Sequence, residues 1–132
     1  MSVFVDTSAL FAILDANDIR HAAARAMWST LAARTEHVAT TNYVLLETVA
    51  LIQHRLGIAA VRALQEDVAP VLHVHWISAE DHDAAISALL TAGRRRLSLV
   101  DCTSFSVMRR MGISRVFAFD EHFAEQGFEC IP

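Results

Sequence analysis

Lysine is absent from this chain of 132 residues, and all 11 of its basic residues are arginines. A phosphate-binding loop of the Walker type needs a lysine, so the sequence excludes that class of nucleotide-binding protein. Phosphotransfer sites that depend on a lysine ammonium are disfavoured for the same reason. The net charge of −4 argues against a protein that coats nucleic acid through general electrostatic attraction.

Cysteine is scarce, and long apolar runs are missing. Cys102 and Cys130 are the only two cysteines, and they form no Cys-x-x-Cys pair. Two cysteines in a chain of this size make no disulfide framework, so we expect both to be small buried residues of a protein in the reducing cytoplasm. No apolar run approaches the roughly 20 residues that cross a bilayer. The N-terminus also lacks the basic and apolar segments of a signal peptide, so we expect no membrane association.

The chain has enough apolar material for one core, since 54% of its residues are hydrophobic. The apolar pattern predicts strands at residues 3–5, 37–40, 71–77, 116–119 and 128–131. It predicts helices at residues 9–14, 19–33, 42–56, 59–69, 79–93, 99–111 and 121–126. Such alternation is typical of a mainly parallel sheet with helices on both faces. We predict one α/β domain over residues 1–132, with three α/β/α layers around a five-stranded sheet.

The first predicted strand ends at a carboxylate. Val3, Phe4 and Val5 form an apolar run without alternation, as expected of a strand covered on both faces. Asp6 follows this strand directly and precedes a predicted helix, at the sheet edge where open α/β proteins bind ligands. Aspartate is also a favoured N-cap residue, so helix capping is the alternative role of Asp6 taken alone.

Three further acids stand out. Asp120 repeats the arrangement of Asp6, because it follows an apolar strand and precedes a helix. Asp101 opens a predicted helix, where the helix dipole by itself favours an acid. Glu47 lies in a helix that is apolar on nearly all sides and is therefore expected to be buried. Glutamate is rarely buried without a partner, so a functional role for Glu47 is favoured over a place on a narrow exposed stripe.

Four carboxylates gathered at one edge would repel one another, and each would lose several kcal/mol in desolvation. A hard divalent cation such as Mg²⁺ or Mn²⁺ removes this conflict, since it prefers carboxylate and water oxygens. Without these four, the remaining 11 acids balance the 11 arginines, so the net charge of the chain equals the charge of the predicted site. We therefore predict a catalytic metal site formed by Asp6, Glu47, Asp101 and Asp120.

In their order and surroundings these residues resemble the PIN domain family and, within it, the VapC-type toxins of bacterial toxin–antitoxin pairs. The resemblance is carried by five stretches, at residues 5–10, around 47, at 97–105, at 119–123 and at 127–128. It implies a five-stranded parallel sheet and a metal-dependent endoribonuclease, with Ser8 as a hydroxyl beside the four acids. One departure is Ala118, where many members of the family have threonine or serine.

A VapC-type toxin implies RNA as the substrate, a VapB-like antitoxin as the inhibitory partner and a homodimer within the complex. In such an enzyme the metal lowers the pKa of a bound water, which attacks the phosphate in line. Two alternatives stay open. One is a PIN-like scaffold that binds a partner without catalysis. The other is an aspartate-based phosphotransfer domain, against which the lack of lysine counts.

Other polar features each have two interpretations. His73 and His75 share one face of a predicted strand, but we find no third zinc ligand and expect two surface histidines. His122, close to Asp120, either contacts substrate or belongs to the surface. The three arginines at residues 94–96 either hold substrate phosphates or form a solvated loop.

The first two predicted helices carry more large apolar side chains than one buried face of each helix needs. We expect some of them to remain exposed as a patch for a protein partner, the alternative being that all belong to the core. These side chains are Leu10, Phe11, Leu14, Met27, Trp28 and Leu31.

Overall fold

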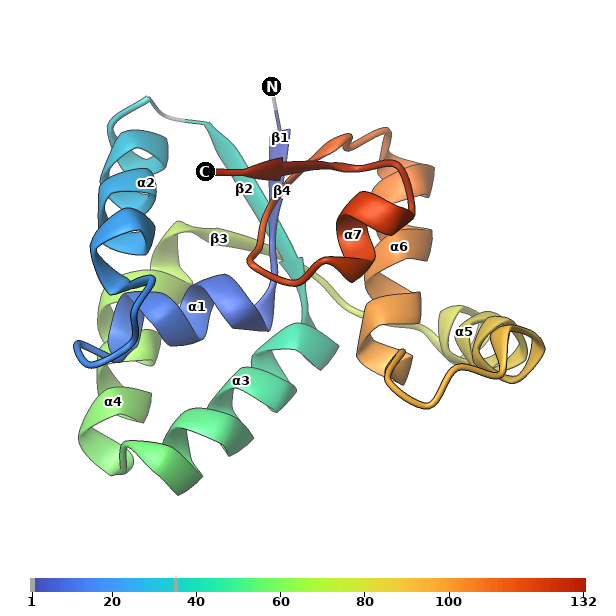
Figure 1. The fold of residues 1–132 in the computed structure, drawn as a ribbon, viewed down its shortest axis with the longest axis horizontal. Coiled ribbons are helices and arrows are strands. Elements are labelled where there is room, and N and C mark those ends of the chain that lie inside the picture. The colour runs from blue at the N-terminus through green and yellow to red at the C-terminus, as the bar shows by residue number, and fades with distance from the viewer. Residues whose placement is uncertain (1, 35) are drawn as a thin grey trace.

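The computed structural model describes residues 2–34 and 36–132. At its centre is a five-stranded sheet in which all neighbouring strands are parallel, in the order β3-β2-β1-β4-β5 (Figure 1). The strands are β1 (Ser2–Val5), β2 (His37–Thr41), β3 (Leu72–His75), β4 (Arg115–Phe117) and β5 (Glu129–Ile131). The predicted parallel sheet of five strands is confirmed.

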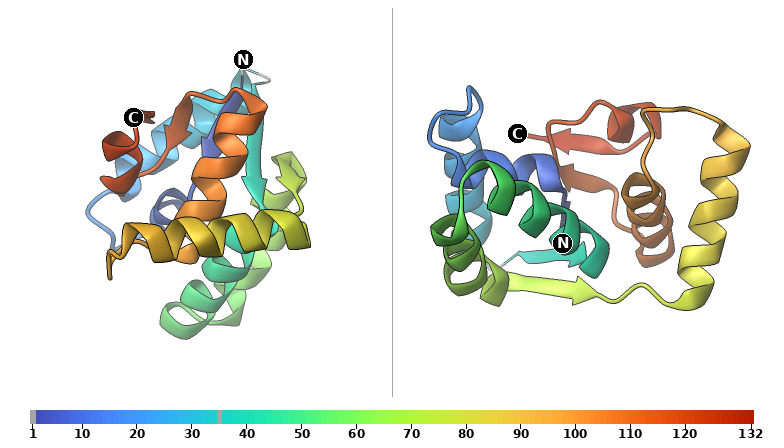
Figure 2. Two further views of the ribbon diagram at one scale, coloured as in Figure 1. Left: turned by 90° about the vertical axis from the view of Figure 1, so that its right-hand side faces the viewer. Right: turned by 90° about the horizontal axis from the view of Figure 1, so that it is seen from below.

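Helices cover both faces of the sheet. In Figure 1, α1, α2 and α4 lie on one side of the strands, and α5 and α6 lie on the other. The right view of Figure 2 shows the strands between these two helical layers, as the prediction of three α/β/α layers required. The helices are α1 (Thr7–Leu14), α2 (His21–Ala33), α3 (Asn42–Arg55), α4 (Ile58–Ala63), α5 (Ala79–Ala92), α6 (Leu99–Met111) and α7 (His122–Glu125). Within the described ranges, no helix is long and apolar enough to cross a membrane.

The strand order reverses at β1. The chain leaves β1 toward β2 and β3 on one side of the sheet, and returns to β4 and β5 on the other. In open α/β sheets, ligands bind outside the carboxyl ends of the strands at such a switch point. Asp6 follows β1 and the segment carrying Asp120 follows β4, so both reach this edge.

Local signals in the sequence set most helix ends. Thr41 caps α3, and Ser78 and Ser98 each form a capping box at the start of α5 and α6. Gly93 and Gly112 close the same two helices with φ values of +61° and +69°. These left-handed conformations are accessible to glycine at little cost, which explains why both helices stop there.

Several predicted boundaries are wrong. The third strand, predicted at residues 71–77, is the shorter β3. The helix predicted at residues 59–69 is α4 followed by a π-helical turn, Leu64–Val68, and a 3-10 turn, Ala69–Val71, which contains Pro70. Proline is tolerated at the start of a new turn because its missing N–H is not needed there. The fourth strand ends at Phe117, two residues early, because the N–H of Phe119 donates to the Ser8 hydroxyl at 3.0 Å.

The predicted patch on the first two helices is not exposed. Leu10 and Leu31 are buried in the core. The other four side chains are partly buried and pack against the same core, namely Phe11, Leu14, Met27 and Trp28. Because α1 packs on both α2 and α3, it buries more than one face. Large apolar side chains are exposed elsewhere, including Leu46 on α3 and Trp76 after β3.

Candidate metal centre

Asp6 lies at the end of β1, caps α1 and is only 3% exposed. Its carboxylate accepts hydrogen bonds from the Ser8 hydroxyl at 2.8 Å and the Ser8 backbone N–H at 3.2 Å. Burial raises the pKa of Asp6 from 3.8 to about 7, and the hydrogen bonds from Ser8 offset only part of this effect. The nearby charges of Asp101 and Glu47 raise this pKa further. Asp6 is thus both a helix cap and a member of an acidic group.

Ser8 connects the two strands that flank the switch point. Its hydroxyl donates to Asp6 and accepts the backbone N–H of Phe119. The backbone N–H of Asp6 in turn donates to the carbonyl of Phe117 at 3.1 Å. These bonds hold the segment that carries Asp120 against the start of α1.

Asp101 is the third residue of α6 and is 7% exposed. Its backbone N–H donates to the Ser98 hydroxyl at 3.0 Å, and its carboxylate accepts the backbone N–H of Ser98 at 3.2 Å. Burial raises the pKa of Asp101 above its usual value, and the charge of Asp120 adds to this, although the bonds with Ser98 oppose it. The cap uses one carboxylate oxygen, which leaves the other for a ligand.

Asp120 and His122 follow β4 in a tight turn. The Asp120 carboxylate accepts the backbone N–H of His122 at 2.9 Å, and Nε2 of His122 lies 3.9 Å from the same oxygen. Asp101, Asp120 and His122 each offer one ligand atom within 4.8 Å of the other two. In the described part of the chain, this is the one group of three or more such residues close enough to hold a metal ion.

The prediction that Glu47 is buried in a fully buried helix is wrong. One side of α3 faces the core, while the neighbouring Leu46 is 70% exposed and Glu47 itself is partly exposed. Apolar residues such as Leu46 on the outer side of α3 are the reason why the sequence predicts a buried helix. The charge of Glu47 nevertheless acts on Asp6, so this residue lies at the margin of the acidic group.

The predicted acids therefore form a connected group in which Asp101 is shared. Asp101 interacts electrostatically with Asp6 on one side and belongs to the trio with Asp120 and His122 on the other. Glu47 connects to the group through Asp6. The structure thus gathers these acids at one sheet edge, as their positions in the sequence predict.

Glu125, which the sequence analysis did not single out, lies behind His122 and is bound by Arg94. The Glu125 carboxylate is 3.6 Å from Nδ1 of His122 and accepts a hydrogen bond from Arg94 at 2.9 Å. The bond from Arg94 lowers the pKa of Glu125 below its usual value. The contact between His122 and Glu125 has a signal in the sequence, because residues three apart in a helix lie on one face. Arg94 is thus engaged within the protein.

The donor set fits a divalent cation. Asp101 and Asp120 offer carboxylate oxygens, which Mg²⁺ and Mn²⁺ prefer. Burial outweighs the interactions that favour the charged form of Asp6 and Asp101, since the pKa of each is raised. A bound cation would compensate these buried charges.

The histidines of β3 have other contacts. The ring of His73 stacks on His37 with 3.9 Å between ring centroids. Nε2 of His75 lies 3.4 Å from the Asp81 carboxylate and 2.9 Å from a nitrogen of Arg110, which also binds Asp81. We call His75, Asp81 and Arg110 the β3 cluster.

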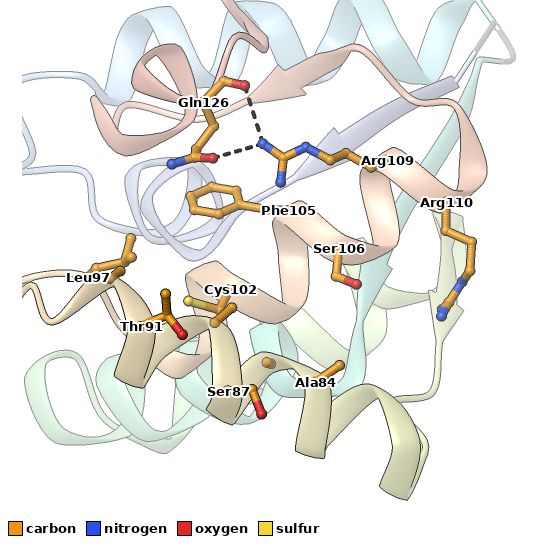
Figure 3. Close-up of a pocket in the computed structure, with 13 residues that line it drawn as sticks. Ala84, Ser87, Thr91, Leu97, Cys102, Phe105, Ser106, Arg109, Arg110 and Gln126 are labelled. Carbon is orange, nitrogen blue, oxygen red and sulfur yellow. Dashed lines mark hydrogen bonds between the residues drawn. The ribbon is translucent and has the colours of Figure 1, made fainter.

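A cavity of about 890 Å³ lies between α5 and α6, and the predicted acids do not line it. Figure 3 shows Cys102 and Phe105 of α6 on one side of it and Ser87 of α5 on another. Arg109 donates to the Gln126 side chain at 2.8 Å, and its guanidinium lies over the Phe105 ring. This arginine is therefore held at the rim by protein groups.

Comparison with known proteins agrees with this geometry. Residues 3–129 match the PIN domain family. The chain belongs to the PIN domain family, and it is a VapC-type member of it.

The similarity to a VapC protein extends over almost the whole chain. The sequence is 39% identical over 127 residues to the "23S rRNA-specific endonuclease VapC20" of Mycobacterium tuberculosis, covering 96% of this chain and 95% of VapC20. The crystal structure of VapC20, titled a Sarcin-Ricin loop cleaving toxin, has a TM-score of 0.85 and covers 98% of this chain and 99% of that one. PAE2754 from Pyrobaculum aerophilum is 20% identical with a TM-score of 0.69, covering 98% of this chain and 89% of that one, and supports the fold alone.

Proposed function

We propose that this chain is a metal-dependent endoribonuclease and the toxin of a type II toxin–antitoxin pair. The observation that carries the proposal is the group of buried carboxylates at the switch point of the sheet. Among the described residues, Asp6, Asp101 and Asp120 make no ion pair with an arginine. Membership of the PIN domain family and similarity to an endonuclease support the class of reaction.

Asp101 and Asp120 would hold Mg²⁺ or Mn²⁺, with Asp6 and Glu47 completing the acidic group. Such an ion, when bound, supplies an activated water and neutralises charge on the phosphate. The Ser8 hydroxyl fixes the Asp6 carboxylate by donating to it. The capping box fixes Asp101 in the same way, so both carboxylates are oriented before an ion binds.

RNA is the proposed substrate, and the sarcin–ricin loop of 23S rRNA is the first target to test. The similarity to VapC20 over nearly the full length of both chains supports this choice. Arg95 and Arg96 are exposed in the loop before α6, where they would contact backbone phosphates. Ribosomal RNA as a target places the proposed action in the cytoplasm.

A toxin of this class is expected to have a cognate VapB-like antitoxin that inhibits it. We further propose that the chain forms a homodimer through the exposed apolar surface of α3. Leu46 and Trp76 are 70% and 73% exposed there and line a shallow hollow together with Tyr43. Exposed apolar patches of this kind mark protein interfaces.

The dimer is tested by molar mass in solution. Leu46→Ser and Trp76→Ser are expected to yield monomers, since each replaces a central apolar contact with a polar group. Ile58→Ser, at a 59% exposed position on α4, is the matched control and should keep the dimer. A monomeric wild-type protein would contradict the proposal.

The two alternative functions predict different behaviour. A non-catalytic scaffold has no need to keep buried acids that cost desolvation energy, and an aspartate-based phosphotransfer domain would become labelled by a phosphoryl donor. Neither explains why the acids gather without a lysine or arginine partner.

The decisive experiment incubates the purified chain with a sarcin–ricin loop RNA in Mg²⁺ or Mn²⁺. We expect cleavage by the wild type, loss of cleavage with a chelator, and no cleavage by Asp101→Asn. The matched control is Asp83→Asn, which changes an exposed acid on α5. Equal cleavage by all three proteins would refute the proposed site.

A further inference from the structure

His122 is the histidine that lies among the carboxylates of the proposed metal centre. Its side chain is 12% exposed, and Nε2 lies 3.9 Å from the Asp120 carboxylate. On the other side of the ring, Nδ1 is buried, has no hydrogen-bond partner among the described residues, and lies 3.6 Å from the Glu125 carboxylate. One carboxylate therefore faces each ring nitrogen.

This placement is the one that metal-binding histidines adopt. A ligating imidazole usually donates its second N–H to a carboxylate or a carbonyl, which fixes the tautomer and the orientation of the ring. Glu125 offers such a carboxylate to Nδ1 and leaves the lone pair of Nε2 on the side of Asp120. Arg94 holds Glu125 by a hydrogen bond of 2.9 Å, so the orienting group is itself fixed.

We propose that Nε2 of His122 is a ligand of the metal ion, that Glu125 is its positioning residue, and that the site for this reason prefers Mn²⁺ to Mg²⁺. The inference rests on the proposed metal centre at Asp101 and Asp120. Mg²⁺ is bound through oxygen atoms, whereas imidazole is a ligand of transition-metal ions. A nitrogen in the donor set adds affinity for Mn²⁺ that Mg²⁺ does not gain to the same extent.

Other histidines are engaged elsewhere in the fold. His37 and His73 stack on each other, Nδ1 of His82 lies 2.6 Å from the Tyr43 hydroxyl, and Nδ1 of His21 lies 2.8 Å from a backbone carbonyl. A histidine nitrogen bound to Mn²⁺ at this centre would therefore belong to His122.

Electron spin echo envelope modulation of Mn²⁺ bound to the full chain tests the ligand directly. We expect ¹⁴N modulation in the wild type and its replacement by ¹⁵N modulation when the protein is made with ¹⁵N-histidine. This labelled wild-type measurement needs no variant to fold. The modulation should disappear in His122→Gln and persist in His54→Gln, which changes an exposed histidine near the end of α3. A wild-type Mn²⁺ complex without ¹⁴N modulation, or modulation that persists in His122→Gln, would overturn the assignment.

Calorimetric titration provides the second measurement. Glu125→Ala should raise the Kd for Mn²⁺ on the order of tenfold, as is typical when the partner of a ligating histidine is removed, and His122→Gln should raise it at least as much. The Kd for Mg²⁺ should change much less, and equal losses for the two ions would overturn the preference.

Asp101→Asn separates this inference from the proposed function. If Mn²⁺ binding survives in that variant, the metal centre itself is wrong. If binding is lost in Asp101→Asn but the wild-type complex has no nitrogen ligand, the centre stands and only the role of His122 is refuted.

Discussion

The β3 cluster and the acidic group both bring histidine close to aspartate, and they differ in one component, an arginine. In the β3 cluster, Arg110 binds Asp81, and its hydrogen bond lowers the pKa of Asp81 far below the usual range. At the switch point, burial without a cationic partner raises the pKa of Asp6 to about 7. A carboxylate whose charge is compensated within the protein has a structural role, whereas a buried carboxylate without a cationic partner is a candidate for ligand binding.

The largest difference between the two regions is expected in metal binding. Asp120→Asn removes a proposed ligand and should weaken Mn²⁺ binding by at least about a hundredfold, since even partners of ligands contribute ten- to a hundredfold. Asp81→Asn should leave the affinity unchanged, because Asp81 is already bound by Arg110. Calorimetric titration measures the Mn²⁺ affinity of both variants. Equal losses of affinity would contradict the proposal that only the acidic group binds metal.

The next effect concerns stability without metal. A pKa of about 7 for Asp6 in place of 3.8 corresponds to a penalty of roughly 4 kcal/mol above pH 7. Asp6→Asn keeps a side chain able to cap α1 and removes the charge, so it should stabilise the chelator-treated protein at pH 8 by up to about that amount. Urea denaturation measures the change. A destabilised Asp6→Asn protein would mean that the charge of Asp6 is already compensated.

The pH dependence should follow the same logic. Because the pKa of Asp6 is raised in the folded state, the folded protein binds more protons than the unfolded one between about pH 4 and pH 7. The metal-free wild type should therefore gain stability as the pH falls from about 7 toward 4, to the extent set by Asp6. Asp6→Asn should flatten this part of the profile, and an unchanged slope would contradict the assignment.

The smallest effect is expected at the β3 cluster. Arg110 is half exposed, so Arg110→Gln should cost no more than about 1 kcal/mol near neutral pH. Since the pKa of Asp81 is lowered in the folded state, this contribution is present above about pH 4 and is lost as the pH falls. Thermal unfolding of wild type and variant should therefore converge in acid. A difference that grows in acid would point to another role for Arg110.

Local sequence signals are sufficient to predict the strands of the sheet and the positions of three of the acids. Asp6 and Asp120 directly follow apolar segments, and Asp101 follows the capping serine Ser98, so their places depend on neighbours in the chain. A parallel sheet then brings strand ends to one edge without further information. The roles of these residues remain predictions for the experiments above.

Features that depend on distant contacts were not predictable in this way. Arg94 and Glu125 are 31 residues apart and meet only when the loop before α6 lies beside α7. The exposure of Glu47 depends on which side of α3 other elements cover, and an apolar helix gives no periodicity from which to decide. The π-helical turn after α4 likewise could not be predicted from the neighbouring residues.

The hydrogen bond between the Ser8 hydroxyl and the Phe119 backbone has a consequence for how the protein is made. It joins groups that lie 111 residues apart in the chain. During synthesis Asp6 and Ser8 are made long before Phe119, Asp120 and His122, so this bond cannot form until the segment after β4 has been added. A product that ends before Asp120 therefore lacks two residues of the proposed metal centre.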